Sequence, residues 1–205
     1  MTAVDVRQLD GAAGAIEECL RDGGVVLLPT DTVYGLAALP EHPDAAARIF
    51  ALKGRPSSVN LPILVADPGD IARLGGVISP AAARLLASRF VPGPLTLAVG
   101  IDSARAPAWL AGRVEAAFRL PAEAWLLSVI RAVGPVYATS ANIHAGQPKE
   151  AVADILPDLT GQPDLAIDGG VRATIASTLV NCNVEPAVIE RVGVVPAAEI
   201  EAVLA

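Results

Sequence analysis

Four short polar clusters each follow an apolar stretch of the chain and end in a turn. They span residues 29–35, 53–56, 119–121 and 139–142. Hydroxyl and cationic side chains in such clusters meet when the elements that carry them lie side by side. If they converge on one cleft, that cleft suits a polyanion such as ATP, because guanidinium groups pair with phosphate through two parallel hydrogen bonds.

The candidate ligands in such a cleft fall into two groups. The cations are Lys53, Arg55, Arg119 and Arg191. The neutral hydrogen-bonding side chains are Thr30, Thr32, Ser140 and Asn142. Hydroxyl and amide groups both donate and accept, so the second group would add hydrogen bonds to the cleft without adding charge.

Each cluster taken singly also has an ordinary structural explanation. Thr30 and Asp31 follow a strand, where such residues commonly form turns. Lys53 and Arg55 follow a helix, where cations complement the helix dipole, and the polar residues of the fourth cluster are of the type that caps helices. Arg119 is harder to explain in this way, because a cation within an apolar stretch is costly to bury without a partner.

Several common sites are absent from the sequence. It contains neither the G-x-x-x-x-G-K-[ST] loop nor the G-x-G-x-x-G turn that cradle phosphates, and it has no G-x-S-x-G nucleophile motif. His42 and His144 lie far apart with no third ligand at metal spacing. Cys19 and Cys182 are equally separate, which favours structural thiols over a disulfide framework or a zinc site.

The composition predicts one compact domain over residues 1–205. Hydrophobic residues make up 53% of the chain but aromatic residues only 3%, so we expect an aliphatic core of helices packed on a sheet. No apolar stretch approaches the ~20 residues that span a bilayer, and the N-terminus does not resemble a secretory signal. These features predict a cytoplasmic protein without a membrane segment, and the net charge of −7 disfavours strong general binding to nucleic acid.

Hydrophobic periodicity and turn residues predict the elements that must position these clusters. Helices are expected over residues 11–21, 44–52 with Asp44 as a possible N-cap, 70–74, 80–90, 122–132, 150–156 and 196–204. Strands are expected over residues 25–28, 61–65, 95–99, 115–120, 136–139, 165–167, 178–180 and 187–190. Residues 103–112 could form either a mobile loop or a packed irregular segment.

Pro29 explains why the first cluster should lie at the end of a strand. Proline cannot donate a hydrogen bond to a sheet, so the strand over residues 25–28 ends there and residues 30–35 form a loop at its carboxyl end. In open α/β sheets, ligands bind at the carboxyl ends of strands.

Six motifs occur in order along the chain, and together they resemble the YrdC/TsaC family. They are residues 29–36 (PTDTVYGL), 53–56 (KGRP), 92–96 (PGPLT), 119–121 (RLP), 140–142 (SAN) and 177–178 (ST). The resemblance extends from about residue 23 to residue 191. It implies the short, single-domain form of the family and a twisted mixed parallel and antiparallel sheet, flanked by helices around a deep concave cavity.

The resemblance also implies an activity, L-threonylcarbamoyladenylate synthesis from L-threonine, bicarbonate and ATP with Mg²⁺, for the N6-threonylcarbamoyladenosine modification of tRNA. By similarity, the threonine side of the site would contain Thr32, Arg119 and Ser177. The nucleotide side would contain Lys53, Arg55, Ser140, Asn142 and Arg191, of which Lys53 and Arg55 would be catalytic. Further partners implied are tRNA or tRNA-modifying proteins.

The chain departs from the family pattern at several positions. Glu115 stands where a hydroxyl residue is expected, Ala176 where glutamate is frequent, and Asn181 where aspartate is usual. Residues 59–60 and the loop after Asn142 differ as well, and we expect each change to lie at the rim of the cleft. Two alternatives therefore stay open: a divergent paralogue that acts on another carbamoyl compound, and a non-catalytic RNA-binding module.

Overall fold

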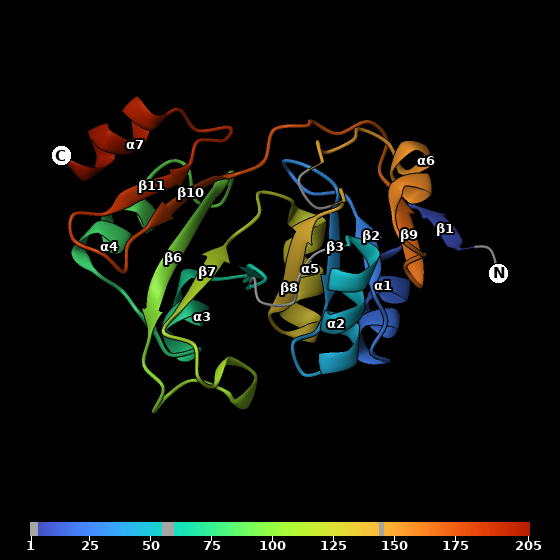
Figure 1. Cartoon of the computed structure of the whole chain (residues 1–205), viewed down its shortest axis with the longest axis horizontal. Helices are drawn as coiled ribbons and strands as arrows, with labels where there is room; N and C mark the ends of the chain where they lie inside the picture. Colours follow the sequence, from blue (N-terminus) through green and yellow to red (C-terminus); the bar gives the residue numbers. More distant parts are fainter. Residues whose placement is uncertain (1–3, 55–59, 144–145) are drawn as a thin grey trace.

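The computed structural model describes residues 4–54, 60–143 and 146–205 of the chain (Figure 1). Its strands are β1 (Asp5–Gln8), β2 (Val26–Leu28), β3 (Gly35–Ala38), β4 (Ile63–Leu64), β5 (Gly76–Val77), β6 (Leu95–Ile101), β7 (Glu115–Arg119), β8 (Val136–Ser140), β9 (Leu165–Asp168), β10 (Thr178–Asn181) and β11 (Val188–Arg191). Its helices are α1 (Ala13–Arg21), α2 (Pro43–Leu52), α3 (Pro68–Arg73), α4 (Pro80–Leu86), α5 (Ala124–Val133), α6 (Val152–Ile155) and α7 (Ala197–Leu204).

All of these strands belong to one twisted mixed sheet. The order is β1-β9-β2-β3-β8-β4-β7-β6-β10-β11, and β5 pairs with β6 outside this path. The pairs β1–β9, β2–β9, β4–β7 and β6–β10 are parallel, and the other pairs are antiparallel. The predicted mixed sheet flanked by helices is confirmed.

Helices cover the two faces of the sheet unequally. On one face, α1 and α5 bury Ile16, Leu20 and Leu126 against β2, β3, β4, β8 and β9. On the other face, α2, α3, α4, α6 and α7 pack over a larger area that reaches β6, β7 and β10. The layer made by α1 and α5 therefore ends near β4 and leaves one face of β6, β7 and β10 without a helix, among the described residues.

The register of β4 and β7 decides which side chains meet that uncovered face. Leu64 pairs with Arg119, whereas Ile63 pairs with Phe118. Leu64 packs in the α1–α5 cluster, and Phe118 packs in the larger cluster on the opposite face. Because side chains alternate along a strand, Arg119 projects toward the side where the α1–α5 layer ends.

Three short strands were not predicted, and each lacks the usual signal. The sequence of β3 is Gly-Leu-Ala-Ala, which contains no β-branched residue, and it is a strand because its backbone pairs on both sides with β2 and β8. β1 lies at the sheet edge with every side chain exposed, so it shows no alternation. β5 is only a two-residue pairing with β6.

Two predicted helix ends are wrong for identifiable local reasons. The N-cap of α2 is His42 and not Asp44, because Pro43 occupies the first helical position, where its missing N–H is no loss. α4 ends at Leu86 and not at residue 90. The Ser88 hydroxyl donates to the carbonyl of Leu85 and accepts from Phe90 N, which replaces helical backbone bonds.

Residues 103–112 form a packed irregular segment. They include a 3₁₀ turn, Ala108–Leu110, whose Leu110 side chain is fully buried in the larger core cluster. Among the described residues, no helix has the length and apolar content needed to cross a membrane.

Candidate functional site

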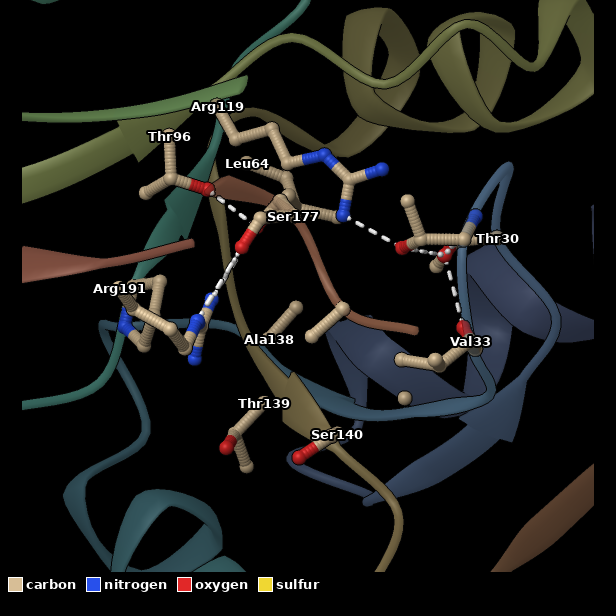
Figure 2. Close-up of a pocket in the computed structure, with 14 residues that line it drawn as sticks. Thr30, Val33, Leu64, Thr96, Arg119, Ala138, Thr139, Ser140, Ser177 and Arg191 are labelled. Atoms are coloured by element: carbon tan, nitrogen blue, oxygen red, sulfur yellow. Dashed lines mark hydrogen bonds between the residues drawn. The ribbon is translucent and has the colours of Figure 1, made fainter. Parts of the chain in front are cut away.

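A pocket lies where the α1–α5 layer ends, and Figure 2 shows its walls. Its lining residues are Thr30, Thr32, Val33, Gly35, Pro62, Leu64, Thr96, Arg119, Ala138, Thr139, Ser140, Ala176, Ser177 and Arg191. The volume is about 90 Å³, below the roughly 300–1,000 Å³ of pockets that enclose drug-sized ligands. This space fits an amino-acid-sized group better than a whole nucleotide, so the deep concave cavity stays a prediction.

The loop between β2 and β3 forms one wall through a chain of hydroxyl groups. Thr30 Oγ1 donates to the carbonyl of Val33 at 2.7 Å, and it lies 3.1 Å from Thr32 Oγ1. Since the Thr30 hydrogen is used on that carbonyl, Thr32 is the donor of the pair. Thr32 Oγ1 also accepts from Arg119 Nη1 at 2.8 Å, so one lone pair of the Thr32 hydroxyl remains for a ligand.

Arg119 forms the next wall, and three groups hold its guanidinium. Nε donates to the carbonyl of Gly93 at 3.0 Å, Nη1 to Thr32, and Nη2 to Asp31 Oδ1 at 2.7 Å. Gly93 has φ of +155°, and a Cβ there would lie 2.8 Å from the carbonyl oxygen of Phe90. A glycine is therefore needed at position 93, whose own carbonyl turns toward Arg119.

Burial gives Arg119 an unusual electrostatic environment. The residue is only 8% exposed, and its desolvation lowers the pKa of the guanidinium, an effect that the nearby Asp31 carboxylate opposes. The sequence already indicated that a cation at this position needs a partner, and Asp31 is that partner. The turn that contains Thr30 thus contributes one partner of a buried ion pair, Asp31 with Arg119.

Ser177, Thr96 and Arg191 form the opposite wall. The hydroxyls of Ser177 and Thr96 lie 2.7 Å apart. Arg191 donates from Nε and Nη2 to the carbonyl of Ser177, at 3.1 and 2.8 Å, and from Nη2 to its hydroxyl at 3.3 Å (Figure 2). Partial burial and the like charge of Arg119 both lower the pKa of the Arg191 guanidinium, which indicates that the two arginines interact across the pocket.

The segment between β9 and β10 brings Ser177 into the pocket. It runs across the top of the view from one part of the sheet to the other (Figure 1). Tyr34 fixes its start, because the phenol donates to the carbonyl of Gly170 at 2.7 Å and accepts from Gly169 N at 3.0 Å. Gly193 fits against its end, where a Cβ would lie 2.1 Å from the carbonyl oxygen of Ala176.

Lys53 lies beside the pocket and is 3% exposed. Its ammonium donates to the main-chain carbonyls of Ser140 and Asn142, the latter at 2.6 Å. The Asn142 amide donates to the carbonyls of Ile143 and Gly146 at 2.8 and 2.7 Å. Lys53 and Asn142 thus shape the loop that follows β8, and Ser140, the last residue of β8, lines the pocket.

The structure brings most of the predicted site residues together. Thr32, Arg119, Ser177, Ser140 and Arg191 all line the pocket. Lys53 and Asn142 contact its wall through the loop after β8, and Arg55 lies outside the described residues.

Asp31 and Thr96 were not predicted as site residues, although both contact the predicted ones. The alternation of side chains in β6 was a usable signal for Thr96, since it is a hydroxyl residue between the buried Leu95 and Leu97. For Asp31 no local signal distinguishes an arginine partner from a turn former, because Arg119 is far away in sequence.

The departures from the family pattern do not all lie at the pocket. Ala176 lines it. Glu115 and Asn181 instead lie at the other end of β7 and β10, where Asn181 Nδ2 donates to Glu115 at 3.3 Å and to Glu190 at 2.8 Å. Glu115 lies four positions before Arg119 along the extended strand, a distance of roughly 13 Å. The expectation that each change lies at the cleft rim is therefore wrong for Glu115 and Asn181.

Comparisons with known proteins point to one family. The family model for Sua5, YciO and YrdC, described as "Telomere recombination", matches residues 18–193. Curated relatives called threonylcarbamoyl-AMP synthase are 37% identical over 189 residues in Bacillus subtilis, covering 90% of this chain and 54% of that protein, and 38% identical over 188 residues in Pyrococcus abyssi, covering 90% and 55%.

A solved structure of a relative adds a ligand to this comparison. The structure of P. abyssi Sua5 complexed with L-threonine superposes with a TM-score of 0.85 and 32% identity, covering 98% of this chain and 61% of that one. The chain therefore spans little more than half the length of these relatives.

Proposed function

Because the chain belongs to the Sua5/YciO/YrdC family, we propose that it is an L-threonylcarbamoyladenylate synthase. In this proposal, L-threonine, bicarbonate and ATP give threonylcarbamoyl-AMP and pyrophosphate. The observation that carries it is the convergence of Arg119, Arg191, Thr32 and Ser177, from three remote parts of the sequence, on one pocket of amino-acid size. The relatives called threonylcarbamoyl-AMP synthase and the relative complexed with L-threonine support the choice of substrate.

The polarity of the pocket matches an amino acid. Arg119 keeps one N–H on each terminal nitrogen beyond the bonds it makes to Thr32 and Asp31. These two donors suit a carboxylate, which binds arginine through two parallel hydrogen bonds. Thr32 offers a lone pair beside them, and it would accept from the amine or the hydroxyl of the substrate.

The chemistry divides into two steps. The amine of threonine attacks bicarbonate and gives a carbamate with loss of hydroxide as water. The carbamate oxygen then attacks the α-phosphorus of ATP and pyrophosphate leaves. The protein contributes by orienting the reactants and offsetting negative charge, which is where Arg191 and Ser140 would act.

The nucleotide would extend beyond the pocket of about 90 Å³. Ser140 lies at the pocket wall next to the loop that Lys53 holds, and we propose that the phosphates lie on this side. Arg55 follows Lys53 closely in sequence, so it belongs to the same proposed phosphate side.

Magnesium would enter with the phosphates of ATP. The residues that line the pocket include hydroxyl groups but no carboxylate, and no group of three or more His, Cys, Asp or Glu among the described residues could hold a metal ion. In nucleotide sites Mg²⁺ is usually held by the substrate phosphates together with one or two carboxylates, so the metal ion would arrive bound to ATP. We therefore assign no step to a metal ion held by the protein.

The wider biological role follows from the product. We propose that residues 1–205 work as one domain, that the product is passed to tRNA-modifying proteins for N6-threonylcarbamoyladenosine formation, and that this takes place in the cytoplasm. The net charge of −7 makes tight binding to tRNA by general electrostatics a weaker alternative. Among the departures at described residues, Ala176 in the pocket wall still favours a paralogue with another carbamoyl substrate.

One experiment tests the proposal directly. The purified protein is supplied with ATP, Mg²⁺, labelled bicarbonate and L-threonine, and the product is identified by mass spectrometry while pyrophosphate is quantified. We expect label in a threonylcarbamoyl adenylate and no pyrophosphate when threonine is omitted. Pyrophosphate release that ignores threonine, or turnover with carbamoyl phosphate instead, would refute the assignment.

A further inference from the structure

The ion pair between Asp31 and Arg119 differs from every other ion pair of the described residues. Its two side chains are only 11% and 9% exposed, and the atoms are 2.7 Å apart. In each other described pair, at least one partner is considerably more exposed, as in Arg105 with Asp102 at 56% and 40%. Exposed pairs contribute little to stability, whereas buried pairs impose a geometry on both partners.

We propose that Asp31 is a positioning residue for the substrate carboxylate: it does not line the pocket, but it holds the Arg119 guanidinium so that its free N–H groups face the ligand. This inference rests on the proposed function and deepens it by adding a residue to the amino-acid subsite. Asp31 would act entirely through Arg119.

The donor count of Arg119 supports this role. The guanidinium has five N–H groups, and three of them go to Gly93, Thr32 and Asp31. The bonds to Gly93 and Asp31 fix opposite ends of the group, which leaves little rotation about the side-chain torsions. The two N–H groups that remain are on the two terminal nitrogens, as a bidentate carboxylate requires.

The charge balance of the pocket supports it as well. Asp31 offsets the charge of Arg119, while Arg191 makes no ion pair among the described residues and donates only to Ser177. Asp31 therefore relieves the repulsion between the two arginines that face each other across the pocket, a repulsion also evident in the lowered pKa of Arg191. The net charge of this subsite is close to that of one cation, suited to one carboxylate.

Stability alone does not explain the pair. Asp31 Oδ2 is buried and has no hydrogen-bond partner among the described residues. An unpartnered buried carboxylate oxygen carries a desolvation cost, and apolar residues of similar volume often replace buried ion pairs without loss of stability. The arrangement is better explained by the orientation that it imposes on Arg119.

The test measures L-threonine binding and turnover in the full chain. The variants are Asp31→Ala, Asp31→Asn and the surface control Asp102→Ala, with thermal unfolding as the folding check. Titration calorimetry gives the threonine dissociation constant without requiring turnover. We expect Asp31→Ala to weaken threonine binding and raise its KM about tenfold, the loss of one hydrogen bond to a charged group, while the KM for ATP stays within about twofold.

Asp31→Asn keeps an oxygen that can accept from Arg119, so it should recover most of the loss. In an Arg119→Lys background the effect of Asp31→Ala should shrink to under about threefold, because lysine has no fork to orient. An unchanged threonine dissociation constant in Asp31→Ala overturns the inference. So do a fall in kcat with both KM values unchanged, an Asn variant as impaired as the Ala variant, and an undiminished effect in the Lys background.

These outcomes are separate from the fate of the proposed function. If the unsubstituted protein neither binds L-threonine nor releases pyrophosphate in its presence, the proposed function fails. If the unsubstituted protein is active and Asp31→Ala behaves like Asp102→Ala, only the inference about Asp31 fails.

Discussion

The two ends of β7 carry polar side chains in contrasting environments. At the pocket end, Arg119 is 8% exposed and its partners come from loops far away in sequence. At the other end, Glu115 is only partly buried, and it accepts from Asn181 and Asn183 at 3.3 Å each. The first cluster orders several segments around a pocket, whereas the second links side chains of β7 and β10, the two strands that flank β6 in the sheet.

This difference indicates what a departure from the family pattern means at each end. A change at Arg119 would leave buried partners without a donor, so few substitutions are compatible with the pocket. At the far end Glu115 accepts a hydrogen bond from Asn181. The acidic residue could therefore stand on β10 and the neutral residue on β7 with this contact retained. The experiments below test whether function really resides at one end only.

The largest effect is expected from Arg119→Ala. It removes the proposed carboxylate ligand and leaves Asp31 as a buried charge without a partner, so we expect kcat/KM for threonine to fall by about 10²–10³-fold. Threonine-dependent pyrophosphate release measures this loss. Glu115→Gln on the same strand is the matched control. A loss smaller than about threefold in Arg119→Ala would remove the contrast between the two ends.

Lys53→Met is expected to affect both stability and turnover. The ammonium of Lys53 is buried and donates to the carbonyls of Ser140 and Asn142, and methionine would leave both acceptors without this donor. We expect the free energy of unfolding to fall by about 2–5 kcal/mol, with turnover reduced because the end of β8 and the loop after it lose their support. Urea denaturation and pyrophosphate release are measured together.

Lys149→Met is the control for this experiment, because Lys149 pairs with Asp158 at the surface and is 42% exposed. If Lys53→Met abolished turnover with an unchanged free energy of unfolding, Lys53 would be a direct ligand of the substrate. That result would contradict the role in positioning the loop and favour the catalytic role that the resemblance implies.

The sequence predicted the sheet and the pocket residues to different extents. Strands with β-branched or large apolar residues, such as β2 and β6, were predicted from local pattern. β3 was not, because its small residues pair only through tertiary context. Thr32, Arg119 and Ser177 could be assigned from motif resemblance, but the partner of Arg119 could not. A hydrogen bond between Asp31 and a residue 88 positions away leaves no local trace.

The smallest effect is expected from exchanging the acidic group at the far end of β7. Asn181→Asp alone would put a third carboxylate beside Glu115 and Glu190, and the repulsion between these like charges should lower stability by about 1 kcal/mol. Glu115→Thr combined with Asn181→Asp removes one carboxylate as it adds another, so most of that loss should be recovered. Thermal unfolding measures the stability of the single and double variants, and the control is Glu115→Thr alone.

Turnover should stay within about twofold in all three variants. A tenfold change in the KM for ATP would instead show that the substrate reaches Glu115, and the two ends of the strand would then belong to one site.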